Sequence, residues 1–176
     1  MSATLKVEID TQKVMGLLRG LPPSALQGAW RRTLRKTANW IKGQTAKAIS
    51  GAARIPQKLI RRRLYFFLRS GNTGKVWLGL NAIEAHRLGT PRQTRRGVTV
   101  GRHRFEGAWM KKKTGPEGVY RRKGRGRMPY EKVKYDWSGS GEDALKSAAA
   151  RSEARLMTVL RQEVNYELQK AAGRAR

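Results

Sequence analysis

The sequence predicts an α+β protein in which an antiparallel β-sheet with basic loops is packed with two long amphipathic helices, one N-terminal and one C-terminal. Two stripes of apolar residues at helical spacing predict the helices. Between them, short β-prone runs separated by Gly, Pro and Arg clusters predict the sheet. With 176 residues the chain is long enough to bury a core. We therefore expect one domain spanning residues 1–176.

The first two elements are predicted from local patterns. Within residues 1–23, apolar and charged residues alternate from Leu5 to Asp10, which is typical of a half-buried strand, and a brief helix follows before Pro22. A long helix is expected over 24–51, with a capping box at Ser24 and a stop at Gly51. Its apolar stripe comprises Leu26, Trp30, Leu34, Ala38, Ile41, Thr45 and Ile49.

Residues 55–137 are expected to form a basic β region. Ile55-Pro56 opens a short helix, because proline is tolerated in the first turn. Strands are then predicted at 64–68, 75–80, 98–100, 105–110, 118–120 and 130–135, the first two as a hairpin.

The C-terminal helix is predicted over residues 140–173. A flexible joint at 138–141 precedes it, Ser140 is expected to cap it, and Gly173 ends it. At ~1.5 Å per residue, one continuous helix here would be roughly 45 Å long. Its stripe comprises Leu145, Ala149, Leu156, Val159, Leu160, Val164 and Leu168. We expect the two long helices to bracket the sheet and to bury their stripes against it, against each other, or against a neighbouring subunit.

Charge is the strongest functional signal. The chain has 39 Lys and Arg against 12 Asp and Glu, a net charge of +27. Residues 51–135 carry 23 basic and 4 acidic side chains, a net of +19. Such a field attracts polyanions. The candidate residues for binding a polyanion or an acidic partner are Arg61, Arg62, Arg63, Arg95, Arg96, Arg102, Arg104, Lys111, Lys112, Lys113, Arg121, Arg122, Lys123, Arg125 and Arg127. Arg92 belongs to the same region.

The remaining residues give little sign of catalysis. The chain has no cysteine, its two histidines lie apart in Arg-rich surroundings, and the carboxylates after residue 136 read mostly as helix surface charges. We therefore expect no catalytic residue, no metal and no cofactor. Aromatic side chains interleave with the charges, either as sheet core or, less favoured, as platforms for unpaired bases. The candidate interface or core residues are Trp30, Leu34, Trp40, Trp77, Trp109, Leu156, Leu160 and Val164.

The order of motifs resembles a known family. Arg54-Ile55-Pro56 leads to a run of arginines, Gly107-Ala108-Trp109-Met110 follows, and Gly118-Val119-Tyr120-Arg121 precedes a basic loop that ends at Met128-Pro129. Over roughly residues 24–172, this chain resembles the minor tail protein Z family of long-tailed bacteriophages, which is related to the tail-completion proteins.

The resemblance implies a structural virion protein rather than an enzyme. Such proteins act at the head-proximal end of the tail, where they complete the particle for head–tail joining and DNA passage. The implied partners are the tail terminator, tail tube and neck or connector proteins, further copies in a homo-oligomeric ring, and packaged double-stranded DNA. The implied location is the virion, with the host cytoplasm during assembly, and no membrane is expected.

Two other classes stay open from the residues alone. The first is a cellular nucleic-acid-binding protein without sequence specificity, of the ribosome-associated type. The second is a basic nuclease, which is disfavoured because the sequence has no clustered acidic set for a metal.

Overall fold

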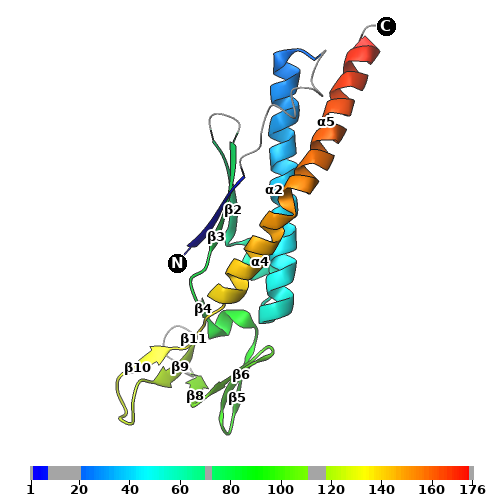
Figure 1. Cartoon of the computed structure of the whole chain (residues 1–176). Helices are drawn as coiled ribbons and strands as arrows, with labels where there is room; N and C mark the ends of the chain where they lie inside the picture. Colours follow the sequence, from blue (N-terminus) through cyan, green and yellow to red (C-terminus); the bar gives the residue numbers. More distant parts are fainter. Residues whose placement is uncertain (1, 8–20, 70–72, 111–117, 175–176) are drawn as a thin grey trace.

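A computed structural model describes residues 2–7, 21–69, 73–110 and 118–174. The molecule is elongated: helices and a three-stranded sheet form a body, and small basic sheets gather at one end (Figure 1). This confirms the α+β class with long N-terminal and C-terminal helices. The brief helix predicted before Pro22 lies outside the described residues.

The first long helix, α2, spans Pro23–Ala53, close to its predicted bounds. The predicted capping box is wrong. Pro22 is the N-cap residue, two residues before Ser24, and no side chain caps the helix, because Pro23 is accommodated at the first helical position. Gly51 does not end the helix either. The chain leaves it at Arg54, whose φ of 55° lies in the left-handed region.

The C-terminal helix is not continuous. It is divided into α4, Ser138–Ala150, and α5, Ser152–Arg174, with Arg151 at the break. The Ser152 hydroxyl donates a hydrogen bond to the Ala149 carbonyl oxygen at 2.7 Å, which satisfies a carbonyl at the end of α4. The predicted flexible joint at 138–141 is wrong, since it forms the first turn of α4 and Ser140 lies inside the helix. Gly141 is buried, and a Cβ at this position would meet the Leu80 side chain at 2.4 Å, so the close packing here requires glycine.

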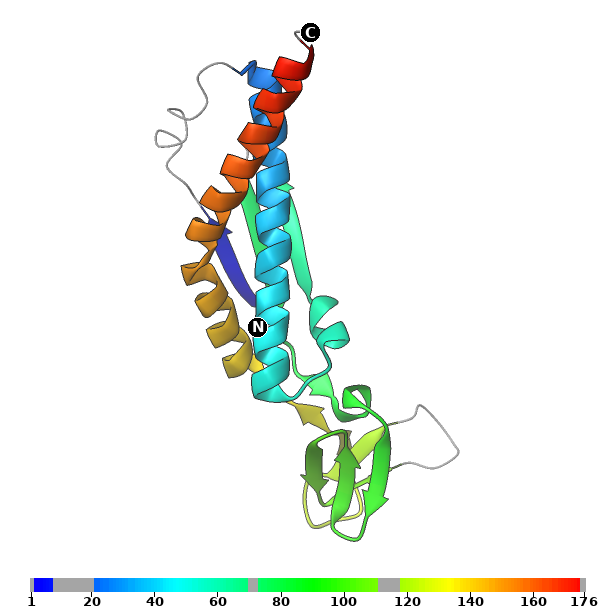
Figure 2. The same ribbon diagram turned by 90° about the vertical axis from the view of Figure 1, so that its right-hand side faces the viewer.

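The three-stranded sheet of the body has the order β1-β3-β2 and is antiparallel throughout. Its strands are β1, Ser2–Val7, β2, Leu64–Arg69, and β3, Thr73–Gly79, so the predicted hairpin pairing is confirmed. The short helix α3, Gln57–Arg61, precedes β2 as predicted. The helices do not bracket this sheet: α2, α4 and α5 all lie on one side of it (Figures 1 and 2).

The remaining strands form separate small sheets at the end of the molecule farthest from the C-terminus (Figure 1). We call this the basic end (residues 83–110 and 118–135). One sheet has the order β5-β6-β7, with β5 Pro91–Thr94, β6 Gly97–Val100 and β7 His103–Glu106. A second has the order β10-β9-β8, with β8 Ala108–Met110, β9 Val119–Arg122 and β10 Tyr130–Lys132. A third pairs β4, Ile83–Glu84, with β11, Lys134–Tyr135, and the 3-10 helix η1, Ala85–Leu88, follows β4.

Two predicted strands are each divided in the structure. The strand expected at 105–110 breaks at Gly107, whose φ of 66° turns the chain between β7 and β8. The strand expected at 130–135 becomes β10 and β11, because the two halves pair with different partners.

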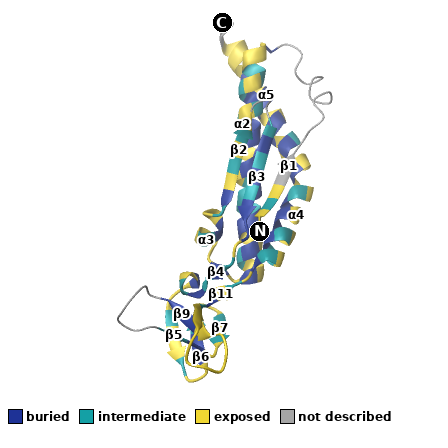
Figure 3. Ribbon diagram, turned by 90° about the vertical axis from the view of Figure 1, so that its left-hand side faces the viewer, coloured by how far each residue is buried: buried dark blue, intermediate teal, exposed yellow. Residues whose placement is uncertain are grey.

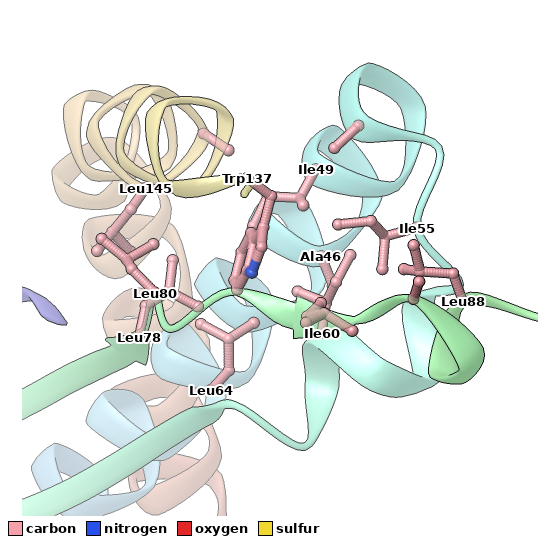
Figure 4. Close-up of a cluster of buried hydrophobic side chains, with 14 of the residues drawn as sticks. Ala46, Ile49, Ile55, Ile60, Leu64, Leu78, Leu80, Leu88, Trp137 and Leu145 are labelled. Atoms are coloured by element: carbon pink, nitrogen blue, oxygen red, sulfur yellow. The ribbon is translucent and has the colours of Figure 1, made fainter. Parts of the chain in front are cut away.

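The larger of two apolar clusters in the described residues runs from the helices into the basic end. Figure 4 shows Trp137 between side chains from α4 and α2, and its indole N–H donates to the Asn81 carbonyl oxygen at 3.1 Å. A smaller cluster joins α5 to the start of α2 around Leu160. Of the predicted core or interface residues, Leu34, Leu156, Leu160 and Val164 are buried and Trp30, Trp40, Trp77 and Trp109 are half-buried. Leu168 is exposed, contrary to its place in the predicted stripe.

Candidate polyanion-binding surface

Exposed cations cover the basic end. Residues 121–130 are exposed without interruption (Figure 3). The exposed cationic side chains of this end include Arg92, Arg95, Arg96, Arg102, Arg104, Arg121, Arg122, Lys123, Arg125 and Arg127. Most of the predicted polyanion-binding residues therefore share one end of the molecule, while Lys111, Lys112 and Lys113 lie outside the described residues.

Strand pairing places arginines on one face of the β5-β6-β7 sheet. Arg92 is opposite Thr99, and Thr99 is opposite Arg104, so the three side chains form a row across the sheet. Val98 and Val100 alternate with Thr99 and are buried on the other face. This sheet thus turns its valines into the core and its arginines outward.

The β8-β9-β10 sheet carries an aromatic cluster on one face. The rings of Trp109 and Tyr120 both meet Tyr130 edge-on, with centroids 5.8 and 5.5 Å from it. The Arg122 guanidinium lies 6.0 Å from the Trp109 ring centroid. Tyr130 is still partly exposed. This face combines a cation with accessible rings, which is the chemistry used to stack nucleic-acid bases.

The β9–β10 connection presents the most basic segment. The Lys123 backbone N–H donates to the Pro129 carbonyl oxygen at 3.0 Å and closes the connection. Arg125 and Arg127 lie between these two residues and are exposed. The connection therefore holds its cations away from the core, where a phosphate chain or an acidic protein surface can reach them.

Some predicted binding residues have local structural contacts instead. Arg63 donates to the Asn81 carbonyl oxygen, and its guanidinium lies 5.8 Å from the Trp137 ring centroid. Burial and the nearby charge of Arg87 lower the pKa of Arg63. Arg61 and Arg62 are exposed but lie at the end of α3, beside the start of β2, rather than within the basic end. Within the 61–63 run, Arg63 therefore makes contacts that stabilise the fold, whereas Arg61 and Arg62 stay exposed to solvent.

The histidines and Glu84 form local contacts. The Glu84 carboxylate pairs with Lys132 at 3.3 Å and His86 at 3.5 Å. Burial would raise the pKa of Glu84, but the hydrogen bond from Lys132 and the surrounding charges outweigh it and lower the pKa. The His103 Nε2 lies 3.3 Å from the Arg54 carbonyl oxygen, and its ring packs 4.3 Å from that of Tyr135.

Sequence reasoning missed a charged network between α2 and α5. Arg32 binds Glu163 and Glu167, each at 2.5 Å, and Lys36 binds Glu163 at 2.5 Å. The two glutamates are buried, contrary to the prediction that such carboxylates are surface charges. A spacing of four residues in both pairs places each pair on one helical face, which is a signal present in the sequence. Burial would raise the pKa of Glu163, but hydrogen bonds from Arg32 and Lys36 lower it.

We expect Glu163→Gln to lower the free energy of unfolding by about 1–2 kcal/mol at neutral pH. The loss is limited because the partners Arg32 and Lys36 are 38% and 62% exposed. Since the folded-state pKa of Glu163 is depressed, its contribution is present above the ordinary value of 4.5 and is lost as pH falls through the folded-state pKa. Urea unfolding at several pH values measures this, and the exposed Glu153→Gln is the control. An unchanged difference between the variants across acid pH would contradict the network.

Among the described residues, no group of three or more His, Asp or Glu side chains is arranged to hold a metal ion. Within the same ranges, no helix has the length and apolar character needed to span a membrane. Comparisons with protein-family models, with curated proteins and with solved structures found no match for this chain.

Proposed function

We propose that this protein is a structural component of a phage virion, which acts in tail completion at the neck, the head-proximal end of the tail, and assists head–tail joining and DNA passage. The observation that carries the proposal is the concentration of exposed arginines at one end of an elongated body. The sequence resemblance to the minor tail protein Z family supports the same role. A surface of this kind suits docking onto DNA or acidic proteins better than it suits turnover of a bound substrate.

The proposed partners are the tail terminator, tail tube and neck or connector proteins, other copies in a ring, and packaged double-stranded DNA. The proposed location is the virion, after assembly in the host cytoplasm. The test is quantitative mass spectrometry of purified particles and of ribosomes from one producing culture. We expect the chain at a fixed copy number in particles, and separate heads and tails when its gene is deleted. Recovery with ribosomes alone would contradict the proposal.

The second candidate function is nucleic-acid binding without sequence specificity in a cell. The specific observation in its favour is the cluster of Trp109, Tyr130 and Arg122, because rings beside a cation stack unpaired bases. This function predicts tight binding by the free chain and cofractionation with RNA. The virion role predicts instead a stoichiometric place in the particle.

We further propose that the protein has no catalytic activity. Purified chain supplied with Mg²⁺, Mn²⁺ or Zn²⁺ is expected to show no turnover of DNA, RNA, nucleotides or peptides above background. The physical reason is that the Glu84 carboxylate at the basic end already pairs with Lys132, His86 and Arg87, so it is not free to bind a metal or to act as a base. Metal-dependent cleavage that disappears in a single Glu or His variant would contradict this prediction.

A further inference from the structure

The outer edge of β2 is open in the described part of the chain. The sheet order is β1-β3-β2, and no described strand pairs with the far side of β2. The Gly79 N–H donates to the Arg63 carbonyl oxygen at 3.0 Å, and the register places Tyr65 and Phe67 in the next hydrogen-bonded positions toward β3. The alternate residues Phe66 and Leu68 therefore direct their backbone N–H and C=O groups outward.

This edge lacks the features that normally prevent strand addition. Edge strands are usually protected by proline, by lysine, by a bulge or by short length. The strand Leu64–Arg69 contains neither proline nor lysine. It also has no bulge, since it pairs with β3 in unbroken register over its six residues. Its backbone groups are thus available to another extended segment.

An aromatic patch lies on the sheet face beside the open edge. Tyr65 and Phe67 are 49% and 50% exposed, and their rings stack with centroids 6.4 Å apart. The Trp77 ring lies 5.6 Å from that of Tyr65 and extends the patch onto β3. Leu64 and Phe66, which alternate with these residues, pack into the core instead. Exposed aromatic side chains next to unpaired backbone are typical of protein interfaces.

Cations stand at both ends of this strand. Arg61 and Arg62 precede β2 and Arg69 ends it, and all three are exposed. In the described part of the chain none of them forms an ion pair. At ~3.3 Å per residue, six residues separate the two sets of charges by roughly 20 Å. A segment that matches this edge needs apolar residues in its middle and acidic residues at its ends.

We propose that the open edge of β2 binds an extended segment of an acidic partner protein, which adds as a strand to the sheet. The segment hydrogen-bonds to Phe66 and Leu68, packs apolar side chains on Tyr65 and Phe67, and pairs its acidic ends with the flanking arginines. A second copy of this chain fits less well, because each copy carries a net charge of +27. The proposal concerns a surface outside the basic end and does not depend on the virion role.

The probes are three synthetic nonapeptides tested against the full chain. The first is Glu-Glu-Val-Thr-Val-Thr-Val-Glu-Glu. The second has proline in place of the central valine and of the threonine before it, because one of two adjacent N–H groups faces β2 in either strand orientation. The third has the same composition as the first, with the acids in the middle. Because proline removes a ladder hydrogen bond, we expect the first peptide to bind at least about tenfold more tightly than the second. The third is expected to bind as weakly as the second. Fluorescence anisotropy measures the affinities.

Two matched variants separate this edge from the basic end. Tyr65→Ser with Phe67→Ser removes the exposed aromatic rings without changing the charge, and we expect it to weaken binding of the first peptide at least tenfold. Arg125→Gln with Arg127→Gln removes two exposed charges from the basic end and is expected to leave that affinity within about twofold. Thermal unfolding of both variants confirms that they fold. Equal binding of all three peptides, or loss of binding in the Arg125 and Arg127 variant, would overturn the proposal.

Amide hydrogen exchange gives a direct readout. The first peptide is expected to slow exchange at Phe66 and Leu68, whose N–H groups face the open edge. Unchanged exchange there despite tight binding would also overturn the proposal. Sedimentation of the free chain tests whether a second copy of the chain binds this edge instead. Self-association that disappears in the Tyr65 and Phe67 variant would assign the edge to a second copy. These experiments do not measure whether the chain is present in virus particles, so the virion role is tested independently of this proposal.

Discussion

Leu160→Ala is expected to lower the free energy of unfolding by about 2–5 kcal/mol. Leu160 is 1% exposed and belongs to the cluster that joins α5 to the start of α2. The substitution removes apolar contacts with Leu21 and Val164 and leaves a cavity that the two helices fill only partly. Urea unfolding followed by circular dichroism gives the difference between the two proteins.

Leu168→Ala is the matched control for this measurement. Leu168 lies two helical turns beyond Leu160 on the same helix and is 42% exposed, so its truncation is expected to change stability by less than about 0.5 kcal/mol. Equal effects of the two substitutions would mean that α5 does not pack on α2 in solution. The pair therefore tests the helical packing on which the body of the molecule depends.

The long helices were predictable because their signal is local and periodic. A stripe with a period of about 3.6 residues identified α2 from Leu26 to Ile49. The break at Arg151 was not predictable in the same way, since both sides of it continue the apolar stripe. The start of α2 depends on its prolines: Pro22 is the N-cap residue and Pro23 the first helical residue, so the N-cap lies two residues before Ser24, where the capping box was predicted.

The division into small sheets depends on contacts between distant residues. The strand β4 contains Glu84, and β5 consists of Pro91 to Thr94 with Arg and Gln between them, so neither reads as a strand from propensity. They form because β11 and β6 pair with them. Placement of α2, α4 and α5 on one side of the body sheet has the same cause, since it is decided by which faces are buried together.

The sequence predicted that the cations of the candidate surface are exposed, but it did not predict which of them lie side by side. Cations without partners must stay at the surface, because burying an unpaired charge costs far more than folding can offset. That argument places Arg125 and Arg127 outside but does not show that Arg92 and Arg104 share one face, which follows from strand register. The same argument misplaced Glu163, because a carboxylate with cations on a neighbouring helix can be buried.

The replacement of Arg121, Arg122, Arg125 and Arg127 by Gln is expected to weaken binding to double-stranded DNA and to reduce its salt dependence. For ~6–10 phosphate contacts, the binding constant of the wild-type chain should fall roughly 10³–10⁵-fold between about 50 and 200 mM salt. Each lost contact reduces the slope of log K against log salt by about 0.9, so four lost contacts reduce it by about 3.6. Titrations at several salt concentrations measure this slope.

The control removes the same number of charges from the body: Arg31, Arg35, Lys47 and Arg161 are all exposed there and are replaced by Gln together. Net charge then changes equally in both variants, so a larger loss of slope in the first identifies the basic end as the contact surface. Assembly distinguishes the partner, because an acidic protein would use the same arginines. Particles that incorporate the first variant but deliver DNA poorly would favour a DNA contact, whereas failure to incorporate it would favour protein docking. Fully infectious particles would show that residues 121–127 form only a solvated hairpin.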